Sequence, residues 1–73
     1  MRLILLFDLP MVTQKEIRIY NRFRKQLIKN GYIMMQFSVY CKLFANREAA
    51  IKHIDMLRKM VPKEGQIRLM LVT

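Results

Sequence analysis

Runs of apolar residues, separated by turn and cap signals, predict four strands and two helices along this chain. The first run is Leu3–Phe7, five successive apolar residues that lead into Asp8 and Pro10. A short continuous apolar run ending at a turn signal is typical of a strand buried on both faces. Proline marks the exit because it cannot donate to a strand ladder. We therefore expect Asp8 at the carboxyl end of a central strand, at the rim of a sheet.

The next segment begins with a helix start signal. Thr13 and Glu16 have the spacing of a capping box, and Gly31 is a suitable residue just past the last turn. The predicted helix extends to about Asn30, with its apolar residues on one broad face. Its cations repeat on the side away from that face, and no acid interrupts them. We call these cations the basic stripe: Lys15, Arg18, Arg22, Lys25 and Lys29.

The rest of the chain predicts two strands, a second helix and a last strand. The strands are expected over Tyr32–Gln36 and Ser38–Phe44, joined by a tight connection. Asn46 is a suitable N-cap for a helix from 47 to about 61, and the last strand covers Gln66–Thr73. The order β-α-β-β-α-β indicates an α+β, ferredoxin-like fold, in which two helices cover one face of a four-stranded antiparallel sheet.

Such a fold leaves the other face of the sheet uncovered. Strands covered on one side should alternate apolar and polar residues, but Leu3–Phe7, Tyr32–Met35 and Leu69–Val72 do not. The uncovered face would be a large apolar patch, which monomers rarely expose. A homodimer that packs sheet against sheet resolves this and enlarges the core of a 73-residue domain. We expect the lone Cys41 and the seven methionines at core positions.

Charge is the strongest compositional signal. Fourteen Lys and Arg against five acids give a formal net charge of +9, which favours a polyanionic partner, nucleic acid before an anionic membrane surface. Like charges four residues apart on a helix repel, and phosphates would relieve that repulsion along the stripe. The alternative is an ordinary solvated face. No segment is long enough to span a membrane, and a single cysteine without an export signal indicates the cytoplasm.

Asp8 is the candidate for chemistry, and two interpretations are open. It is either a turn cap that satisfies loop amides or a metal-binding, acid–base carboxylate held on a rigid strand. Two glycines, one His and one Cys exclude a glycine-rich phosphate loop and an intrachain zinc site. One carboxylate holds Mg²⁺ poorly, so a two-fold axis near Asp8 would have to supply a second. A Mg²⁺ held there could polarise a phosphate and activate a water.

Three segments at their observed spacings resemble the small CRISPR-associated adaptation proteins of the "Cas-two" family, in the form that accompanies type II systems. They are Phe7-Asp8-Leu9-Pro10, Arg18-x-Tyr20-x-x-Phe23-Arg24-Lys25-x-Leu27-Ile28-Lys29-x-Gly31, and Gln36-x-Ser38-Val39-Tyr40-x-Lys42. The resemblance implies a ferredoxin-like homodimer in which Asp8 of each chain binds a shared metal ion. Members are described as metal-dependent endonucleases of RNA or DNA. They are also described as a non-catalytic bridge between dimers of the CRISPR integrase during spacer acquisition.

The resemblance also implies that the basic stripe lies against duplex DNA. Family members usually continue past the fourth strand with a segment that adds a strand to the partner's sheet, so residues 1–73 are expected to form a single domain without it. Three hypotheses follow: a Mg²⁺-dependent nuclease acting on DNA or single-stranded RNA, a purely structural duplex-DNA scaffold for the integrase, or an unrelated ferredoxin-like nucleic-acid-binding module. Aliphatic, methionine-rich strands count against an RNA-recognition domain, whose sheet stacks bases on aromatic residues.

Overall fold

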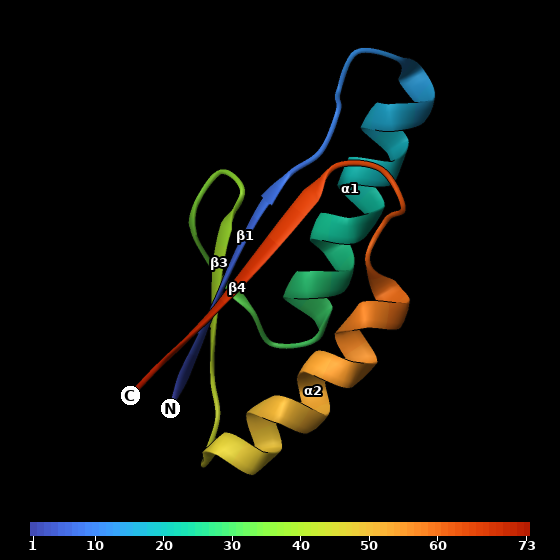
Figure 1. Cartoon of the computed structure of the whole chain (residues 1–73). Coiled ribbons are helices and arrows are strands. Elements are labelled where there is room, and N and C mark those ends of the chain that lie inside the picture. Colours follow the sequence, from blue (N-terminus) through green and yellow to red (C-terminus); the bar gives the residue numbers. More distant parts are fainter.

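The computed structural model describes residues 1–73 and contains six elements (Figure 1). In chain order they are β1 (Arg2–Asp8), α1 (Gln14–Lys29), β2 (Ile33–Gln36), β3 (Val39–Leu43), α2 (Arg47–Met60) and β4 (Gln66–Val72). The strands lie side by side in the order β2-β3-β1-β4, and every neighbouring pair is antiparallel. The predicted ferredoxin-like fold is confirmed.

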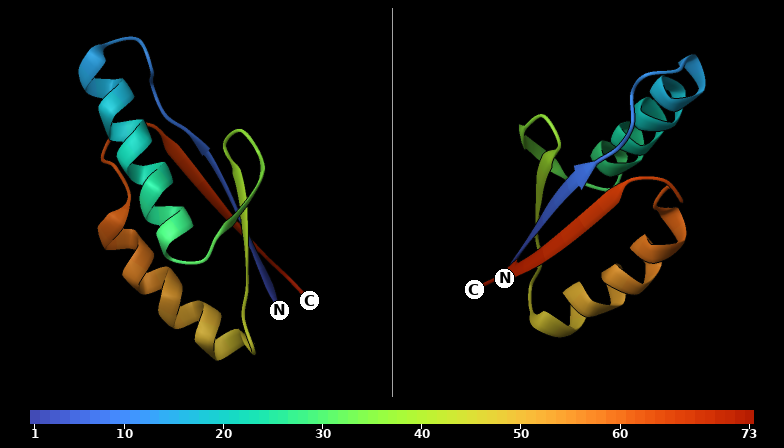
Figure 2. Two further views of the ribbon diagram at one scale, coloured as in Figure 1. Left: turned by 180° about the vertical axis from the view of Figure 1, so that it is seen from behind. Right: turned by 45° about the horizontal axis from the view of Figure 1, so that its top comes forward.

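The two helices lie on the same face of the sheet, so the molecule has two layers (Figures 1 and 2). Each helix turns a stripe of buried side chains inward, in keeping with the spacing of its apolar residues. The buried residues of α1 are Tyr20, Phe23 and Leu27, and those of α2 are Ala50, His53 and Leu57. None of the helices has the length and apolar character needed to cross a membrane.

The predicted helix signals are confirmed in atomic detail. The Thr13 side chain accepts a hydrogen bond from the Glu16 amide at 3.1 Å, and the Glu16 carboxylate accepts one from the Thr13 amide at 2.9 Å. The amides of Thr13 and Val12, which donate to the Glu16 carboxylate, hold the pKa of Glu16 below its usual value. Asn46 caps α2 by accepting from the Ala49 amide at 2.9 Å. These caps satisfy backbone donors that a helix end leaves free.

Strand β1 is buried on one face only. Leu3, Leu5 and Phe7 are buried under the helices, whereas Ile4 and Leu6 point to the other face and are half-buried. Burial on both faces, expected from the apolar run, is therefore wrong for a single chain. The physical reason is that both helices pack on the same side, so alternate β1 residues have no cover within one chain.

The expectation that Cys41 and the methionines fill the core is also wrong. Cys41 is half-buried and lies opposite Ile4 and Ile33, on the face that the helices leave uncovered. None of the methionines is buried. Ile33 is 68% exposed, because β2 is an edge strand with a neighbour on one side only. The core consists instead of aromatic residues and leucines.

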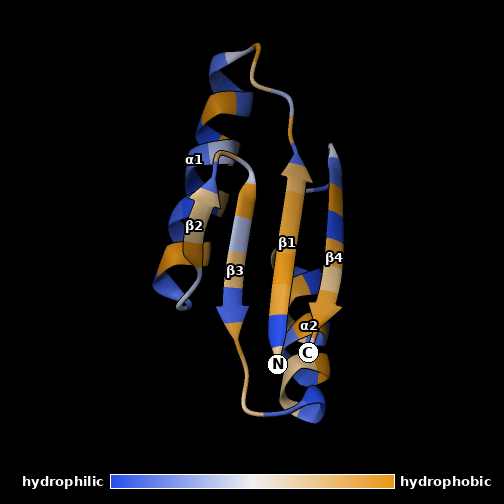
Figure 3. Cartoon of the chain, turned by 90° about the vertical axis from the view of Figure 1, so that its left-hand side faces the viewer, coloured by the Kyte–Doolittle hydropathy of each residue, from blue (hydrophilic) through white to orange (hydrophobic).

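The side of the sheet that the helices leave uncovered is called the open face, and β1, one of its two inner strands, is hydrophobic along most of its length (Figure 3). Side chains directly opposite one another in an antiparallel ladder point to the same face, so the strand register identifies its members. They are Arg2, Ile4, Leu6 and Asp8 of β1, Ile33 and Gln36 of β2, Val39, Cys41 and Leu43 of β3, and Gln66, Arg68, Met70 and Val72 of β4. The predicted apolar patch is present.

Candidate metal and nucleic-acid sites

Asp8 is the last residue of β1 and lies exposed at one end of the open face, opposite Gln66. Its side chain accepts no hydrogen bond from a loop amide or from any other group of the chain. The turn-cap interpretation requires such a bond, and the structure contains none. Asp8 therefore presents a carboxylate free to bind a cation or a proton.

An aromatic cluster on the helix-covered side of the sheet holds the backbone next to Asp8 in place. The Phe7 ring packs on Tyr20, Phe23 and Tyr40, with ring centroids 5.2–5.6 Å apart. The Phe7 amide donates to the Ser38 carbonyl at 3.0 Å, which ties the end of β1 to the β2–β3 turn. Ser38 itself has a φ of +66°, as a tight turn requires. These contacts hold Asp8 on a rigid element, as precise ligand placement needs.

Gly65, just before β4, packs closely against the same backbone. It has a φ of +93°, and a Cβ atom there would lie 2.5 Å from the Asp8 carbonyl oxygen and 2.7 Å from Leu9 Cδ2. Only glycine adopts this conformation without strain and lets the loop after α2 pass so close to Asp8. Gly65 therefore determines how β4 begins beside Asp8.

The carboxylate of Asp8 is a suitable ligand for a hard divalent cation, but one chain supplies too few such ligands to hold the cation. A carboxylate oxygen is the donor that Mg²⁺ prefers. However, no three His, Cys, Asp or Glu side chains of this chain gather into a metal cluster. Asp8 is the only acid on the open face, since the other four lie on the helices or in the loop after α2. One chain thus offers one carboxylate, and a second copy would have to supply another.

Two polar side chains near Asp8 were not singled out from the sequence. Gln66 lies directly opposite Asp8, and Arg68 follows on the same face of β4. The available signal was the beginning of β4, where Gln66 and Arg68 alternate with Ile67 and Leu69. That period of two predicts a polar end to the open face, but only the register shows that it lies beside Asp8.

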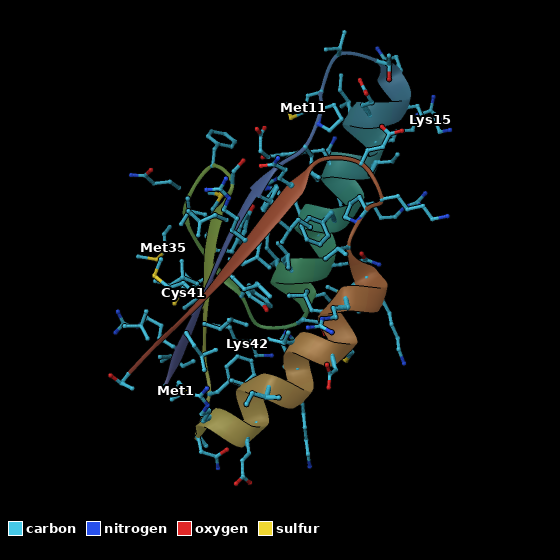
Figure 4. The ribbon with its side chains drawn as sticks, viewed as in Figure 1. Met1, Met11, Lys15, Met35, Cys41 and Lys42 are labelled. Atoms are coloured by element: carbon cyan, nitrogen blue, oxygen red, sulfur yellow. The ribbon has the colours of Figure 1, made fainter.

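The basic stripe lies where the helical pattern predicted it. All five of its residues are exposed, on the side of α1 that faces away from the sheet, and Lys15 projects outward from the first turn of α1 (Figure 4). Four of them line a shallow groove that has no hydrophobic wall: Arg18, Arg22, Lys25 and Lys29. Because Asp8 is on the open face, a single chain does not bring the stripe and Asp8 into one site.

One hollow of the molecule is separate from Asp8. It has a volume of about 380 Å³ and lies between α1 and the segment after α2, where Lys15 and Arg22 form part of its wall. Its lining includes both apolar and charged residues, and Asp8 is not among them. Within one chain, Asp8 is therefore exposed on the open face and lies outside this hollow.

His53 has a structural position. Its Nε2 lies 2.8 Å from the Tyr32 hydroxyl in the core, and its ring packs against Phe44. Burial, with a further contribution from the Lys42 charge, lowers the pKa of His53. Lys42 donates to the Asn30 carbonyl, and its ammonium lies 5.4 Å from the centre of the Phe44 ring. This cluster joins β3 to both helices.

Comparison with known proteins gives a match over the whole chain. Residues 1–73 match the family described as CRISPR associated protein Cas2. A CRISPR-associated endoribonuclease Cas2 of Streptococcus mutans serotype c is 48% identical over the whole chain, which covers 67% of that relative. Proteins of the same name from Acidovorax ebreus and Campylobacter jejuni are 42% and 38% identical, with 72% and 51% of their lengths covered.

Proposed function

Because the chain belongs to the Cas2 family of CRISPR-associated proteins, we propose that it acts as a homodimeric, divalent-metal-dependent endoribonuclease in CRISPR adaptation. The observation that supports this most directly is Asp8, the only acid on the open face, with a free carboxylate at the end of a rigid strand. The relatives named above are endoribonucleases by name, and RNA is therefore the substrate proposed. The lone cysteine fits a cytoplasmic protein.

The apolar open face supports the homodimer. Leu43 is 68% exposed and Met70 is 54% exposed, and both belong to this face. A patch of this kind is stabilised when a second copy covers it, and two-fold symmetry pairs the same patch with itself. Sheet-to-sheet packing would also give Ile4 and Leu6 the cover that they lack in one chain.

The same dimer would complete the metal site. A two-fold axis that passes near Asp8 would place the Asp8 carboxylates of both chains at one end of the interface, and together they would hold Mg²⁺. When bound, such a cation polarises a phosphodiester and makes a water molecule easier to deprotonate. The role of Asp8 is to hold the cation, and the aromatic cluster under Phe7 keeps that carboxylate in place.

The basic stripe is proposed as the nucleic-acid-binding surface. Its five exposed cations follow one side of a 16-residue helix, which suits contacts with successive phosphates. Such contacts bind the backbone without reading its sequence, and their strength falls with added salt. Anions would also relieve the mutual repulsion of the stripe in the free protein.

A non-catalytic scaffold is the second candidate function, and one observation favours it. Asp8 has no His, Cys or second acid beside it that could serve as a general base. In this alternative the stripe binds duplex DNA, and the dimer positions the CRISPR integrase without cutting. The two candidates share the dimer and the stripe, so they differ only in what Asp8 does.

Titration with Mn²⁺ tests the proposed metal site without relying on activity. Isothermal calorimetry combined with light scattering should give a dimer that binds one Mn²⁺ per two chains. Asp8→Asn should lose that binding and remain dimeric, whereas the matched control Asp55→Asn, an exposed acid of α2, should retain it. A monomer, or Mn²⁺ binding unchanged in Asp8→Asn, would refute the shared site.

A further inference from the structure

Arg68 is the nearest cation to Asp8 along the sheet. Asp8 pairs with Gln66, two residues before Arg68, and Arg68 pairs with Leu6, two residues before Asp8. The two residues are therefore diagonal neighbours on the same face of adjacent strands. Diagonal neighbours of an antiparallel pair lie about 7–8 Å apart, within reach of a long side chain. The register thus places Arg68 on the same face as Asp8, the only acid of the open face, and diagonal to it.

The Arg68 side chain has no hydrogen-bond partner within the chain. It is exposed, and its side chain donates no hydrogen bond. Its same-face neighbours Leu6 and Met70 are apolar and offer it no partner, and it makes no hydrogen bond to Asp8. By contrast, the Arg24 guanidinium donates to the Tyr40 hydroxyl at 3.2 Å and has a structural role. Arg68 is free to bind an anion from outside the chain.

In the proposed dimer, burying Arg68 without an anion beside it would cost free energy. A cation taken partly out of water in an apolar interface needs an anion near it. Asp8 is the only acid on this face, and the other cation of the face, Arg2, lies at the far end of β1. If the Asp8 carboxylates hold a divalent cation, they are no longer available to Arg68. A second anion is then required at this end of the interface.

The charges show which anion fits. Two Asp8 carboxylates and one divalent cation sum to zero, so their net charge would not balance the charge of a phosphate that the cation binds. Two Arg68 side chains make the end of the interface doubly positive. A phosphodiester has one negative charge and gains another when hydroxide, a water that has lost its proton, attacks it. The planar guanidinium also matches two phosphate oxygens at once.

We propose that Arg68 binds the scissile phosphodiester beside Asp8 and stabilises the charge that develops on it. This inference rests on the proposed nuclease function and adds a phosphate-binding residue to it. Arg68 forms no covalent bond and transfers no proton. Asp8 holds the cation, and Arg68 holds the substrate. The basic stripe, on the other layer of the molecule, binds the remainder of the strand.

The test compares Arg68→Gln with Arg2→Gln, which removes the same charge from the opposite end of the same face. Cleavage of a labelled single-stranded RNA should fall by about 10²- to 10³-fold in Arg68→Gln, the loss typical of removing one preorganised donor, and change little in Arg2→Gln. Arg68→Lys should recover part of the rate, because it restores the charge without the planar fork.

Two further readouts separate this role from a structural one. Arg68→Gln should remain dimeric, and its Mn²⁺ affinity should stay the same or increase, because a neighbouring cation has been removed. If Arg68→Gln cleaves like the wild type while Asp8→Asn does not cleave, only the Arg68 inference is overturned. If the wild type neither binds Mn²⁺ nor cleaves, the nuclease proposal fails and the inference falls with it.

Discussion

The Tyr32 hydroxyl lies 2.8 Å from Nε2 of His53, and this hydrogen bond links the start of β2 to the middle of α2 inside the core. Burial raises the pKa of Tyr32 to about 12, so its phenol keeps its proton at neutral pH. With that hydroxyl as the donor, Nε2 accepts and must be unprotonated. Burial and the nearby Lys42 charge lower the pKa of His53 and favour this neutral form.

This pair predicts that the protein loses stability in mild acid. The unfolded chain binds a proton at His53 with a pKa of 6.5, whereas the folded chain binds it only at lower pH. The free energy of unfolding should therefore fall as the pH drops below about 6.5 toward the folded value. His53→Gln cannot titrate and should flatten this dependence in urea denaturation curves. An unchanged slope in His53→Gln would contradict the account.

The loop before β4 predicts different costs for two glycine substitutions. Placing a non-glycine residue in the left-handed conformation costs about 1–2 kcal/mol. Gly65→Ala should lower the free energy of unfolding by more than this, because its Cβ would lie 2.5 Å from the Asp8 carbonyl oxygen. Gly31→Ala is the matched control: its φ of +91° is similar, but the nearest atoms, in the flexible Lys42 side chain, are 3.6 Å away.

The same two glycine variants should also differ in their affinity for Mn²⁺. Only Gly65→Ala displaces the backbone of Asp8, so only this variant should weaken Mn²⁺ binding in calorimetry. Equal losses of stability and of Mn²⁺ affinity in both variants would mean that the close contact with Asp8 is unimportant.

The basic stripe predicts a salt-dependent loss of binding on charge reversal. Arg18→Glu with Arg22→Glu should weaken nucleic-acid binding for every sequence tested and reduce the slope of log affinity against log salt by about two. The control reverses Arg47 and Arg58, exposed cations of α2, and changes the net charge equally. Fluorescence anisotropy over a salt series measures both. Equal effects of the two double variants would show that only net charge matters.

The sequence predicted the elements and their caps because those depend on local spacing. The capping box of Thr13 and Glu16 and the one-sided cations of α1 follow from residues three or four apart. The exposure of β2 and of the methionines did not follow, because an apolar run does not say whether a strand lies at the edge of a sheet. The proximity of Arg68 to Asp8 depends on pairing between strands 60 residues apart in sequence, which no local pattern specifies.

Cleavage of labelled single-stranded RNA and duplex DNA over a Mg²⁺ titration, with the wild type beside Asp8→Asn, tests the central claim most directly. We expect metal-dependent cleavage of the RNA by the wild type and none by Asp8→Asn, with nucleic-acid binding through the stripe retained in both. Cleavage that is equal in the two proteins, or tight salt-sensitive duplex binding with no cleavage at any Mg²⁺ concentration, would contradict a catalytic role for Asp8.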